Sequence, residues 1–452
     1  MIPFISNTIL PLFRKKFVKN AFALYSGRSV NLVIGLVSTL FYGVVFLKKD
    51  IAVISLFEMV ANLFLAFGFS WSTMSLTRFG KEELRKSGSL NYTSSIRIGI
   101  MAPILLMSIL TIVIFRDDFL AYIATKDVTI IIYLIFNLVL MVIHEHIVYI
   151  FTTVEKHVMN VLYYLGQSIG KIGILGSFYF GFIGDVSAEL YLKLNVGVLL
   201  VLLLIRMFFI EYRYFFPLII GKKEDYIKQF KYVLPQIYGF CGLYLINWVD
   251  VYFIRKYCSI DDLGSYQFMY SIFLKLSSFA IIVNTLFFPK IMDWKITRSE
   301  NFRKYLKNAP VIMFLTILVL ISIFVFVYPP LFSMFFQDKF KNAYTTFNIL
   351  ILSLPFIFGS YLYVPVLNSY DRVKYIQFTN VVSASCNVLV DYYFIRKFGI
   401  ISAAFGTLLA YMCKYLLLSI AVQKMFKINN TYVNVMSVVM AGCGIIFFTQ
   451  IF

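Results

Sequence analysis

Long apolar stretches follow one another along almost the whole chain, separated by short polar loops. A membrane-spanning helix needs about 20 apolar residues at 1.5 Å of rise per residue, and thirteen stretches come near that length. We expect spans at 24–46, 51–76, 96–115, 129–151, 159–184, 187–210, 232–254, 265–288, 309–328, 345–368, 374–395, 400–422 and 433–451. Composition agrees, because 60% of the residues are hydrophobic and the mean hydropathy is +0.83. The pattern predicts an all-α integral membrane protein with no sizeable soluble domain.

The charges in the loops predict an orientation. With a cytoplasmic N-terminus, the cytoplasmic segments hold 24 of the 41 Lys and Arg residues and the outer segments hold 10. The positive-inside rule therefore favours that orientation. The net charge of +19 is then mostly an orientation signal. Nucleic-acid binding is disfavoured, because the basic residues lie in short separate loops. We expect the first span to be an uncleaved anchor, since its apolar stretch is too long for a signal peptide.

Metal and cofactor sites are not indicated. The five cysteines show neither paired spacing nor a metal motif. His144-Glu145-His146 looks like a metal motif, but residues two apart on a helix point about 200° apart. The two histidines therefore cannot share one ion, and we predict no metal and no cofactor.

The two halves of the chain resemble each other. Three pairs of segments match: Glu155-Lys156-His157 with Asp371-Arg372-Val373, Phe46–Lys49 with Ile254–Lys256, and Gly184–Ala188 with Gly399–Ala403. The offsets are similar, at 371 − 155 = 216 and 254 − 46 = 208 residues. Six spans per unit is an even number, which predicts two parallel six-helix bundles related by a pseudo-two-fold axis along the membrane normal. Transporters built this way place the substrate site between the repeats.

The predicted division of the chain follows from this duplication. It consists of a cytoplasmic segment 1–23, a bundle 24–210, a cytoplasmic connecting loop 211–231, a second bundle 232–422 and a hydrophobic segment 423–452 holding a thirteenth span.

The second half carries segments with a familiar pattern. They are Phe230–Pro235, Asn247–Asp250, Asp262–Tyr266, Pro289, Phe340–Ala343, Asp371–Lys374, Asn387–Asp391 and Phe398–Ala404. Together they resemble polysaccharide flippases of the MATE/MOP superfamily over roughly 228–405. Two places depart from that family's pattern: Lys48–Ser55 replaces a Gly-rich loop, and Arg396-Lys397 replaces the usual proline.

The resemblance implies two six-helix bundles around a central cavity that works by alternating access. It points to Wzx-type flippases, which are not enzymes and move undecaprenyl-diphosphate-linked oligosaccharide repeat units. The expected cargo is O-antigen-like, moved from the cytoplasmic to the outer leaflet of a bacterial inner membrane. Expected partners are that lipid-linked oligosaccharide, membrane lipid, proton or sodium as coupling ion, and the polysaccharide polymerase machinery.

Basic residues inside the spans are the first candidates for substrate binding: Lys171, Lys275, Lys414 and Arg28. A cation in hydrocarbon is costly and usually faces a polar cavity or a partner. Lys171 lies at mid-span and can attract a diphosphate or form a structural ion pair. Lys414 can alternatively snorkel to the interface, and Arg28 can be an interfacial anchor. Arg97 and Arg206 lie at span ends, where we expect anchoring.

Acidic residues inside the spans are candidates for ion coupling: Glu58, Glu145, Asp250 and Asp391. Glu58 and Glu145 can take up and release a proton or neutralise a buried cation. Asp250 and Asp391 are followed closely by Arg255 and Arg396, so local charge balance is the simpler interpretation for them.

Tyrosines within the spans are candidates for stacking on sugar rings, because they combine a flat apolar face with a hydroxyl. They include Tyr163, Tyr164, Tyr244 and Tyr270. Ordinary packing is the alternative for each.

Two other functions stay open. A cation-coupled multidrug exporter would share the fold but should favour acids in its core, whereas the deepest charges here are lysines. A membrane sugar polymerase or glycosyltransferase usually presents a large extramembrane loop. The longest predicted outer loop, 116–127, is only about a dozen residues.

Overall fold

The computed structural model describes residues 10–297, 300–428, 434–435, 438–439 and 442, and every regular element in this part of the chain is a helix. The first half contains α2 (Leu10–Val45), α3 (Lys48–Phe64), α4 (Thr73–Ser75), α5 (Lys81–Ser87), α6 (Asn91–Ile114), α7 (Arg116–Ile123), α8 (Thr129–Thr153), α9 (His157–Tyr179) and α10 (Ala188–Met207). The second half contains α11 (Lys223–Val233), α12 (Gln236–Tyr257), α13 (Ile260–Thr297), α14 (Glu300–Phe336), α15 (Tyr344–Ile351), α16 (Leu354–Ser369), α17 (Val373–Phe398) and α18 (Ile400–Phe426).

The predicted all-α membrane architecture is confirmed. Within the described residues, eight helical segments are long and apolar enough to cross a membrane. Four further helices, α2, α9, α13 and α17, have the length of a span but lie outside that set. Polar side chains in α9 and α17 lower their mean hydropathy. These four helices contribute, together with several of the apolar spans, to the two interior sites described below.

Several predicted span boundaries differ from the observed helices. Helix α2 begins at Leu10, inside the segment 1–23 that we expected to precede the first span. The predicted tenth span, 345–368, is two helices that break at Leu352 and Ser353, just before Pro355. Proline favours the first turn of a helix, so α16 begins there. The thirteenth predicted span, 433–451, lies largely outside the described residues.

The second predicted span is irregular beyond α3. The helix continues as a π-helix at Leu65–Phe69, a 3₁₀ turn at Ser70–Ser72 and a second π-helix at Leu76–Gly80. The hydroxyls of Ser72, Thr73 and Ser75 each donate to a carbonyl three residues earlier. Such local side-chain bonds compete with the regular α-helical ladder, and π-bulges occur frequently at functional sites.

One pair of the matched sequence motifs, Glu155–His157 and Asp371–Val373, has the same backbone conformation. Glu155 and Asp371 both adopt positive φ, at 63° and 58°. The next residue in each half, Lys156 or Arg372, donates its backbone N–H to a carbonyl five residues earlier, at 2.8 Å in both cases. The helix α9 or α17 then begins at His157 or Val373. The third pair of motifs differs, because Ser187 caps the N-terminus of α10 while Gly399 joins α17 directly to α18.

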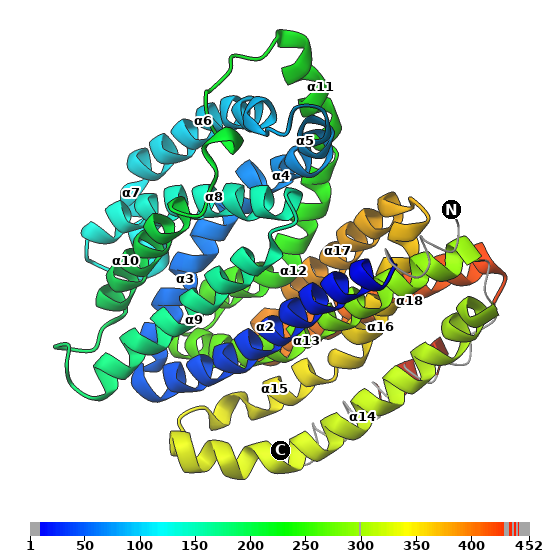
Figure 1. Cartoon of the computed structure of the whole chain (residues 1–452). Coiled ribbons are helices and arrows are strands. Elements are labelled where there is room, and N and C mark those ends of the chain that lie inside the picture. Colours follow the sequence, from blue (N-terminus) through cyan, green and yellow to red (C-terminus); the bar gives the residue numbers. More distant parts are fainter. Residues whose placement is uncertain (1–9, 298–299, 429–433, 436–437, 440–441, 443–452) are drawn as a thin grey trace.

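The two halves form two groups of helices that meet along α2, α3 and α13. Figure 1 shows α3 to α10 on one side, α14 to α18 on the other, and α2 lying beside α13 between them. One continuous hydrophobic core includes Phe46, Phe178, Phe268 and Phe340 from both halves. The packing therefore places α2 and α13 at the centre of the molecule.

Two cations of the second half cap helix ends of the first half. Lys339 Nζ donates to the carbonyl of Gly43, at 2.9 Å, and to that of Phe46, at the end of α2. The Arg255 guanidinium donates to the carbonyls of Ala121 and Tyr122, both at 3.0 Å, at the end of α7. Helix C-termini carry partial negative charge and unpaired carbonyls. These contacts hold the halves together at one end of the molecule.

Candidate functional site

A polar cavity lies where the two halves meet. Its volume is about 230 Å³, and helices α2, α3, α9, α10, α12 and α13 all line it. The polar and aromatic lining residues are Ser38, Thr39, Tyr42, Ser55, Glu58, Ser168, Lys171, Tyr191, Trp248, Gln267, Tyr270, Ser271 and Lys275. We call this the central cavity. It contains three of the charged candidates from the sequence, Lys171, Lys275 and Glu58, which lie on three different helices.

The cavity carries a net positive charge. Lys171 Nζ lies 3.7 Å from Glu58 Oε1, and the two side chains are 38% and 41% exposed. Lys275 forms no ion pair with any residue that the structure describes. Two lysines against one glutamate leave one cation in excess. A half-exposed ion pair contributes only about 0–1 kcal/mol, so an incoming anion can replace Glu58 as the partner of Lys171 at small cost.

Lys275 lies against α2 at a glycine. A Cβ atom at Gly35 would be 3.4 Å from both Cε and Nζ of Lys275, so the absence of a side chain there leaves room for the lysine stem. One turn further along α2, the Thr39 hydroxyl bonds the Gly35 carbonyl at 2.9 Å. Gly35, Ser38, Thr39 and Tyr42 follow helical spacing on one face of α2. This small and polar stripe is the sequence signal that could have located the cavity.

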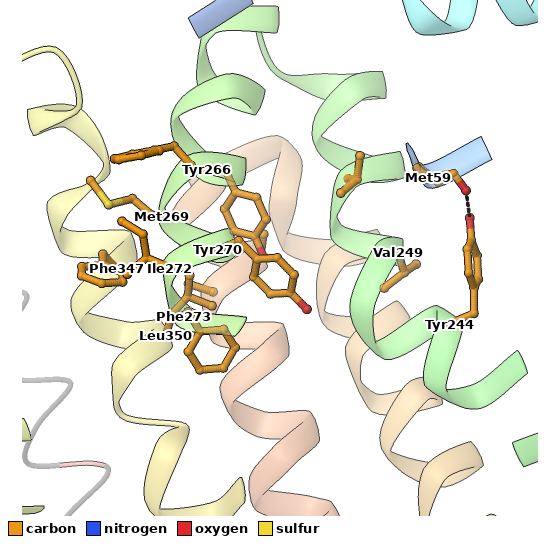
Figure 2. Packing of buried hydrophobic residues seen from close by; sticks show 14 of the residues in the cluster. Met59, Tyr244, Val249, Tyr266, Met269, Tyr270, Ile272, Phe273, Phe347 and Leu350 are labelled. Atoms are coloured by element: carbon orange, nitrogen blue, oxygen red, sulfur yellow. Dashed lines mark hydrogen bonds between the residues drawn. The ribbon is translucent and has the colours of Figure 1, made fainter. Parts of the chain in front are cut away.

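The four tyrosine candidates occupy different surroundings. Tyr270 lines the central cavity and lies beside Tyr266 on α13 (Figure 2). Tyr244 donates its hydroxyl to the Met59 carbonyl at 3.3 Å, as Figure 2 also shows, and is buried. Tyr163 is buried between His144 and the Arg206 guanidinium. Tyr164 lines a separate pocket of about 200 Å³ with Asn31. Of the four tyrosine candidates, therefore, Tyr270 alone shares the central cavity with the lysines.

Sequence analysis missed aromatic residues of the cavity on other helices. Tyr42, Tyr191 and Trp248 line it beside Tyr270. Tyr42 and Tyr191 also pack edge to face, with ring centroids 5.9 Å apart. These residues look like packing positions in the sequence, and only the crossing of α2, α10 and α12 brings them together.

A second interior site contains the acid pair, Asp250 on α12 and Asp391 on α17. Their side chains are 1% and 0% exposed. Asp250 accepts hydrogen bonds from Asn387 Nδ2 and Thr407 Oγ1, both at 2.7 Å, and from the Tyr266 hydroxyl. In contrast, the side-chain oxygens of Asp391 and Asn387 are buried and accept no hydrogen bond from a described donor, and the Asp391 carboxyl lies within hydrogen-bonding reach of Asp250.

We expected Arg255 and Arg396 to balance the charges of Asp250 and Asp391, and this interpretation is wrong. Arg255 donates to the carbonyls at the end of α7, and Arg396 donates to the Tyr257 hydroxyl at 3.1 Å. The site instead gathers carboxylate, amide and hydroxyl oxygens from α12, α17 and α18. Hard cations prefer such oxygen ligands, and a proton shared by two adjacent carboxylates would also relieve their repulsion.

Glu145 lies in a buried network of the first half. It accepts a bond from the Ser70 hydroxyl at 2.6 Å and lies 3.5 Å from the Arg97 guanidinium. Arg97 is fully buried and also donates to Ser72 Oγ at 3.0 Å and contacts His146. Glu145 therefore pairs with a buried cation beside the irregular part of the second span, and it does not line the central cavity.

The expected anchoring roles of Arg97 and Arg206 are wrong. Arg206 is 5% exposed, donates to Asn160 Oδ1 at 3.2 Å and stacks on Tyr163. The two arginines contact opposite faces of α8, through His146 and His144 respectively. This agrees with the helical geometry that keeps the two histidines from sharing one ion. Among the residues that the structure describes, no group of three or more His, Cys, Asp or Glu side chains could hold a metal.

The remaining basic candidates, Lys414 and Arg28, are not among the described residues that line the central cavity. Lys414 on α18 is half-buried, does not line the central cavity and forms no ion pair within the described residues. Arg28 belongs to the described backbone of α2, but its side chain is outside the described part.

Comparison with known proteins identifies the fold. No protein-family model matches the chain, and no curated protein sequence matches it. Among solved structures, the lipid II flippase MurJ in an inward closed conformation is similar with a TM-score of 0.69 and 17% identity over 95% of this chain and 98% of that one. A multidrug resistance transporter of the MATE family, in the MOP superfamily, has a TM-score of 0.60, with 12% identity over 94% and 98%.

A MATE transporter of Vibrio cholerae is similar as well, with a TM-score of 0.58 and 13% identity over 92% of this chain and 98% of that one. These likenesses extend over nearly the whole of each chain, although the sequences have diverged widely. The chain therefore has the two-bundle fold of the MOP-superfamily transporters and is a multi-pass membrane protein.

Proposed function

We propose that this protein is a flippase that moves a lipid-linked oligosaccharide, joined to undecaprenol by a diphosphate, from the cytoplasmic to the outer leaflet of a bacterial inner membrane. The observation that carries the proposal is the net positive central cavity between the two halves. It holds Lys171, Lys275 and Glu58 among hydroxyl and aromatic side chains.

The physical problem of such a substrate is its head group, because a sugar diphosphate cannot enter hydrocarbon without losing its hydration. A cavity that supplies cations and hydroxyls replaces that hydration. Charge-assisted hydrogen bonds from lysine to phosphate are stronger than neutral ones. Tyr270 and Trp248 add flat surfaces suited to sugar rings. Alternating access between the bundles, assigned to 24–210 and 232–422, then carries the head group across.

We assign the coupling-ion role to the acid pair. Three buried oxygens without hydrogen-bond donors, two on Asp391 and one on Asn387, adjoin a carboxylate that already has three donors. Sodium or a proton would satisfy these oxygens. Because α12 and α17 belong to the second bundle, binding there can bias the packing of that bundle against the first.

The cargo assignment rests on two likenesses. The segments quoted from the second half resemble Wzx-type flippases, and MurJ, which has a similar fold, is described as a lipid II flippase. An O-antigen-like repeat unit is a lipid-linked cargo consistent with the sequence resemblance and with the fold similarity. The polysaccharide polymerase machinery would receive this cargo after transport. The charge distribution of the loops supports a cytoplasmic N-terminus.

The multidrug exporter is the second candidate, because Glu58 places a half-exposed carboxylate in the central cavity and two of the similar structures are MATE transporters. An organic cation would pair with Glu58 and be repelled by Lys171 and Lys275. Removal of the two lysines should therefore reduce transport of a lipid-linked diphosphate and increase transport of an organic cation.

The test is transport in proteoliposomes. The purified chain is reconstituted with a fluorescent undecaprenyl-diphosphate oligosaccharide, and its outward appearance is followed with a membrane-impermeant quencher. We expect protein-dependent flipping that falls about 100-fold in the double variant Lys171→Gln, Lys275→Gln. The matched control is Lys81→Gln, whose lysine pairs with Glu155 on the surface.

Each outcome decides between the functions. Flipping that persists in the double variant would remove the cavity lysines from the mechanism. Transport of ethidium, stimulated by loss of the lysines and abolished by Glu58→Gln, would establish the exporter instead. Sugar transfer by the purified protein without flipping would favour a polymerase or glycosyltransferase.

A further inference from the structure

Two polar side chains in the wall of the central cavity have atoms without a hydrogen-bond partner. Ser55 on α3 and Gln267 on α13 are 6% and 7% exposed, and both line the cavity. The Ser55 hydroxyl and the Gln267 amide nitrogen make no hydrogen bond to each other or to any other described group. Burying a polar atom without a partner costs free energy. A ligand group that bonded both atoms would recover that cost.

The two side chains lie along the seam where α3 and α13 begin side by side. A Cβ atom at Gly264 would overlap the Lys48 carbonyl, so the first turns of the two helices are in direct backbone contact. Counted from that contact, Gln267 is three residues into α13 (267 − 264 = 3), and Ser55 is seven residues into α3 (55 − 48 = 7). At 1.5 Å of rise per residue, the two positions differ by about 6 Å in depth.

The charged residues of the cavity lie further along the same two helices. Glu58 is ten residues from the contact (58 − 48 = 10) and Lys275 is eleven (275 − 264 = 11). Ser55 therefore lies about one helical turn before Glu58, and Gln267 lies about two turns before Lys275. A phosphate bound at Lys275 has these two uncharged polar side chains on one side of it.

Aliphatic side chains adjoin the unpartnered atoms. Ile51 and Ile54 line the cavity on the same helix as Ser55, and they are 1% and 2% exposed. Ile51 lies four residues before Ser55, a spacing that makes side chains neighbours on a helix. This part of the wall therefore combines an amide donor, a hydroxyl and a small apolar surface.

An acetamido group has the chemistry that this combination would recognise. It carries an acceptor, its carbonyl oxygen, and a donor, its N–H, on separate atoms, and it ends in a methyl group. Rotation about the last side-chain bond of Gln267 can turn the amide nitrogen toward such an acceptor. A plain sugar hydroxyl offers one oxygen for both partners and has no apolar end.

We propose that Gln267 and Ser55 are specificity-determining residues, which recognise an acetamido group on the sugar that is bonded to the diphosphate. Gln267 donates to the acetyl carbonyl, the acetamido N–H donates to Ser55 Oγ, and the methyl group packs on Ile51 and Ile54. The proposal rests on the proposed function and deepens it, since it names a chemical feature of the cargo. In a 2-acetamido sugar this group is on the carbon next to the phosphate-bearing carbon, which agrees with the short distance along α3 between Ser55 and the charged residues.

The test compares two ligands that differ at that one carbon. Undecaprenyl diphosphate joined to N-acetylglucosamine or to glucose is titrated into the full-length protein in detergent, and both dissociation constants are measured. We expect the N-acetylglucosamine ligand to bind about 10-fold more tightly, because the acetamido group gives both buried atoms a partner.

Two variants remove the recognising atoms one at a time. Gln267→Met keeps the length of the side chain without its amide, and Ser55→Ala removes the hydroxyl. Each should reduce the preference about 5-fold and leave the affinity for the glucose ligand within about 2-fold of the wild type. Neither atom has a partner within the described part of the protein, so both variants should fold. The matched control is Ser322→Ala on α14, whose hydroxyl bonds the Leu318 carbonyl outside the cavity and whose loss should leave the preference unchanged.

The outcomes separate this inference from the proposed function. Equal binding of the two ligands by the wild type, or a preference that survives both variants, would overturn the roles of Gln267 and Ser55 while leaving the flippase proposal intact. A preference for the glucose ligand that the variants lose would show recognition of a hydroxyl and would also overturn the acetamido assignment. Failure of the wild type to bind either ligand would overturn the proposed function, and this inference with it.

Discussion

The central cavity and the acid pair place charges in opposite surroundings. Lys171 and Glu58 are both more than a third exposed and lie 3.7 Å apart, while Lys275 has no ionic partner among the described residues. Asp250 and Asp391 are almost completely buried, and three donors converge on Asp250. The cavity charges can therefore exchange partners with a ligand, whereas Asp250 is held in place by its three hydrogen bonds.

The energetic consequence follows from solvation. A half-exposed ion pair gains about 0–1 kcal/mol, because water screens it. A buried polar group that loses its partner costs about 1–3 kcal/mol, and more if it is charged. Substitutions in the cavity should thus alter binding with little effect on folding, and substitutions at Asp250 should alter folding itself.

The largest expected effect is that of Asp250→Ala. The change leaves the donors of Asn387, Thr407 and Tyr266 without an acceptor in a buried place. We expect the free energy of unfolding to fall by about 3–5 kcal/mol, measured by thermal and denaturant unfolding in detergent. Asp118→Ala, at an exposed acid on α7, is the control and should change it by less than about 0.5 kcal/mol. A variant as stable as the wild type would contradict this account of Asp250.

The next effect concerns the cavity cations. Lys171→Gln or Lys275→Gln should each weaken binding of a prenyl diphosphate about 10-fold, because one charge-assisted hydrogen bond contributes roughly 1.5–3 kcal/mol. Unfolding free energies should stay within about 1 kcal/mol of the wild type. Binding is measured by isothermal titration or radioligand filtration. A large loss of stability at unchanged affinity would show that these lysines support folding, as Asp250 does, and not ligand binding.

A smaller effect is expected for Asp391→Asn, the other member of the acid pair. Its carboxyl oxygens accept no hydrogen bond from a described donor, and the change replaces the second titratable carboxyl beside Asp250 by an amide of the same size. We expect the stability to stay within about 1 kcal/mol of the wild type, because the change keeps the size and polarity of the side chain. The stabilisation of the protein by sodium or by mild acid should disappear. Retained stabilisation by both would exclude Asp391 from cation binding.

The smallest effect belongs to an ion pair between the loop residue Asp127 and Lys193 in the first turns of α10. Lys193 Nζ lies 2.6 Å from Asp127 Oδ2, and this hydrogen bond lowers the pKa of Asp127. A carboxyl with a lowered pKa stabilises the fold above its unfolded pKa of about 3.9 and loses that contribution as the pH falls through the folded value. Asp127→Asn should cost about 0.2–1 kcal/mol at pH 7 and nothing at about pH 2. If Asp127→Asn lowered the stability equally at both pH values, the contact would contribute through packing and not through charge.

Much of the fold could be predicted from the sequence, because membrane spans are set by the length and polarity of local segments. Helices occupy all twelve predicted spans that the structure describes, although boundaries differ at α2 and at the break between α15 and α16. The depth of Lys171 and Lys275 within their spans also singled them out, since a lysine in hydrocarbon needs a polar neighbour.

The errors in the predicted site have a common cause. Depth along a helix does not reveal which face a side chain occupies or which helix lies opposite. Arg97 and Arg206 lie near span ends, yet each is buried against α8. Tyr163 and Tyr244 lie within spans, yet both pack or bond elsewhere than in the cavity. Asp250 and Asp391 are 141 residues apart, and only the packing of α12 on α17 joins them.

The sequence by itself determined that this chain crosses a membrane many times, that its halves carry matching short motifs, and that unusual charges lie inside its spans. Those properties are local, because hydrophobic length and turn motifs are read within about 20 residues. The tertiary structure decided which charges share a cavity and which are held by buried hydrogen bonds. These relations depend on helix rotation and crossing, which arise from side-chain packing between segments far apart in the chain.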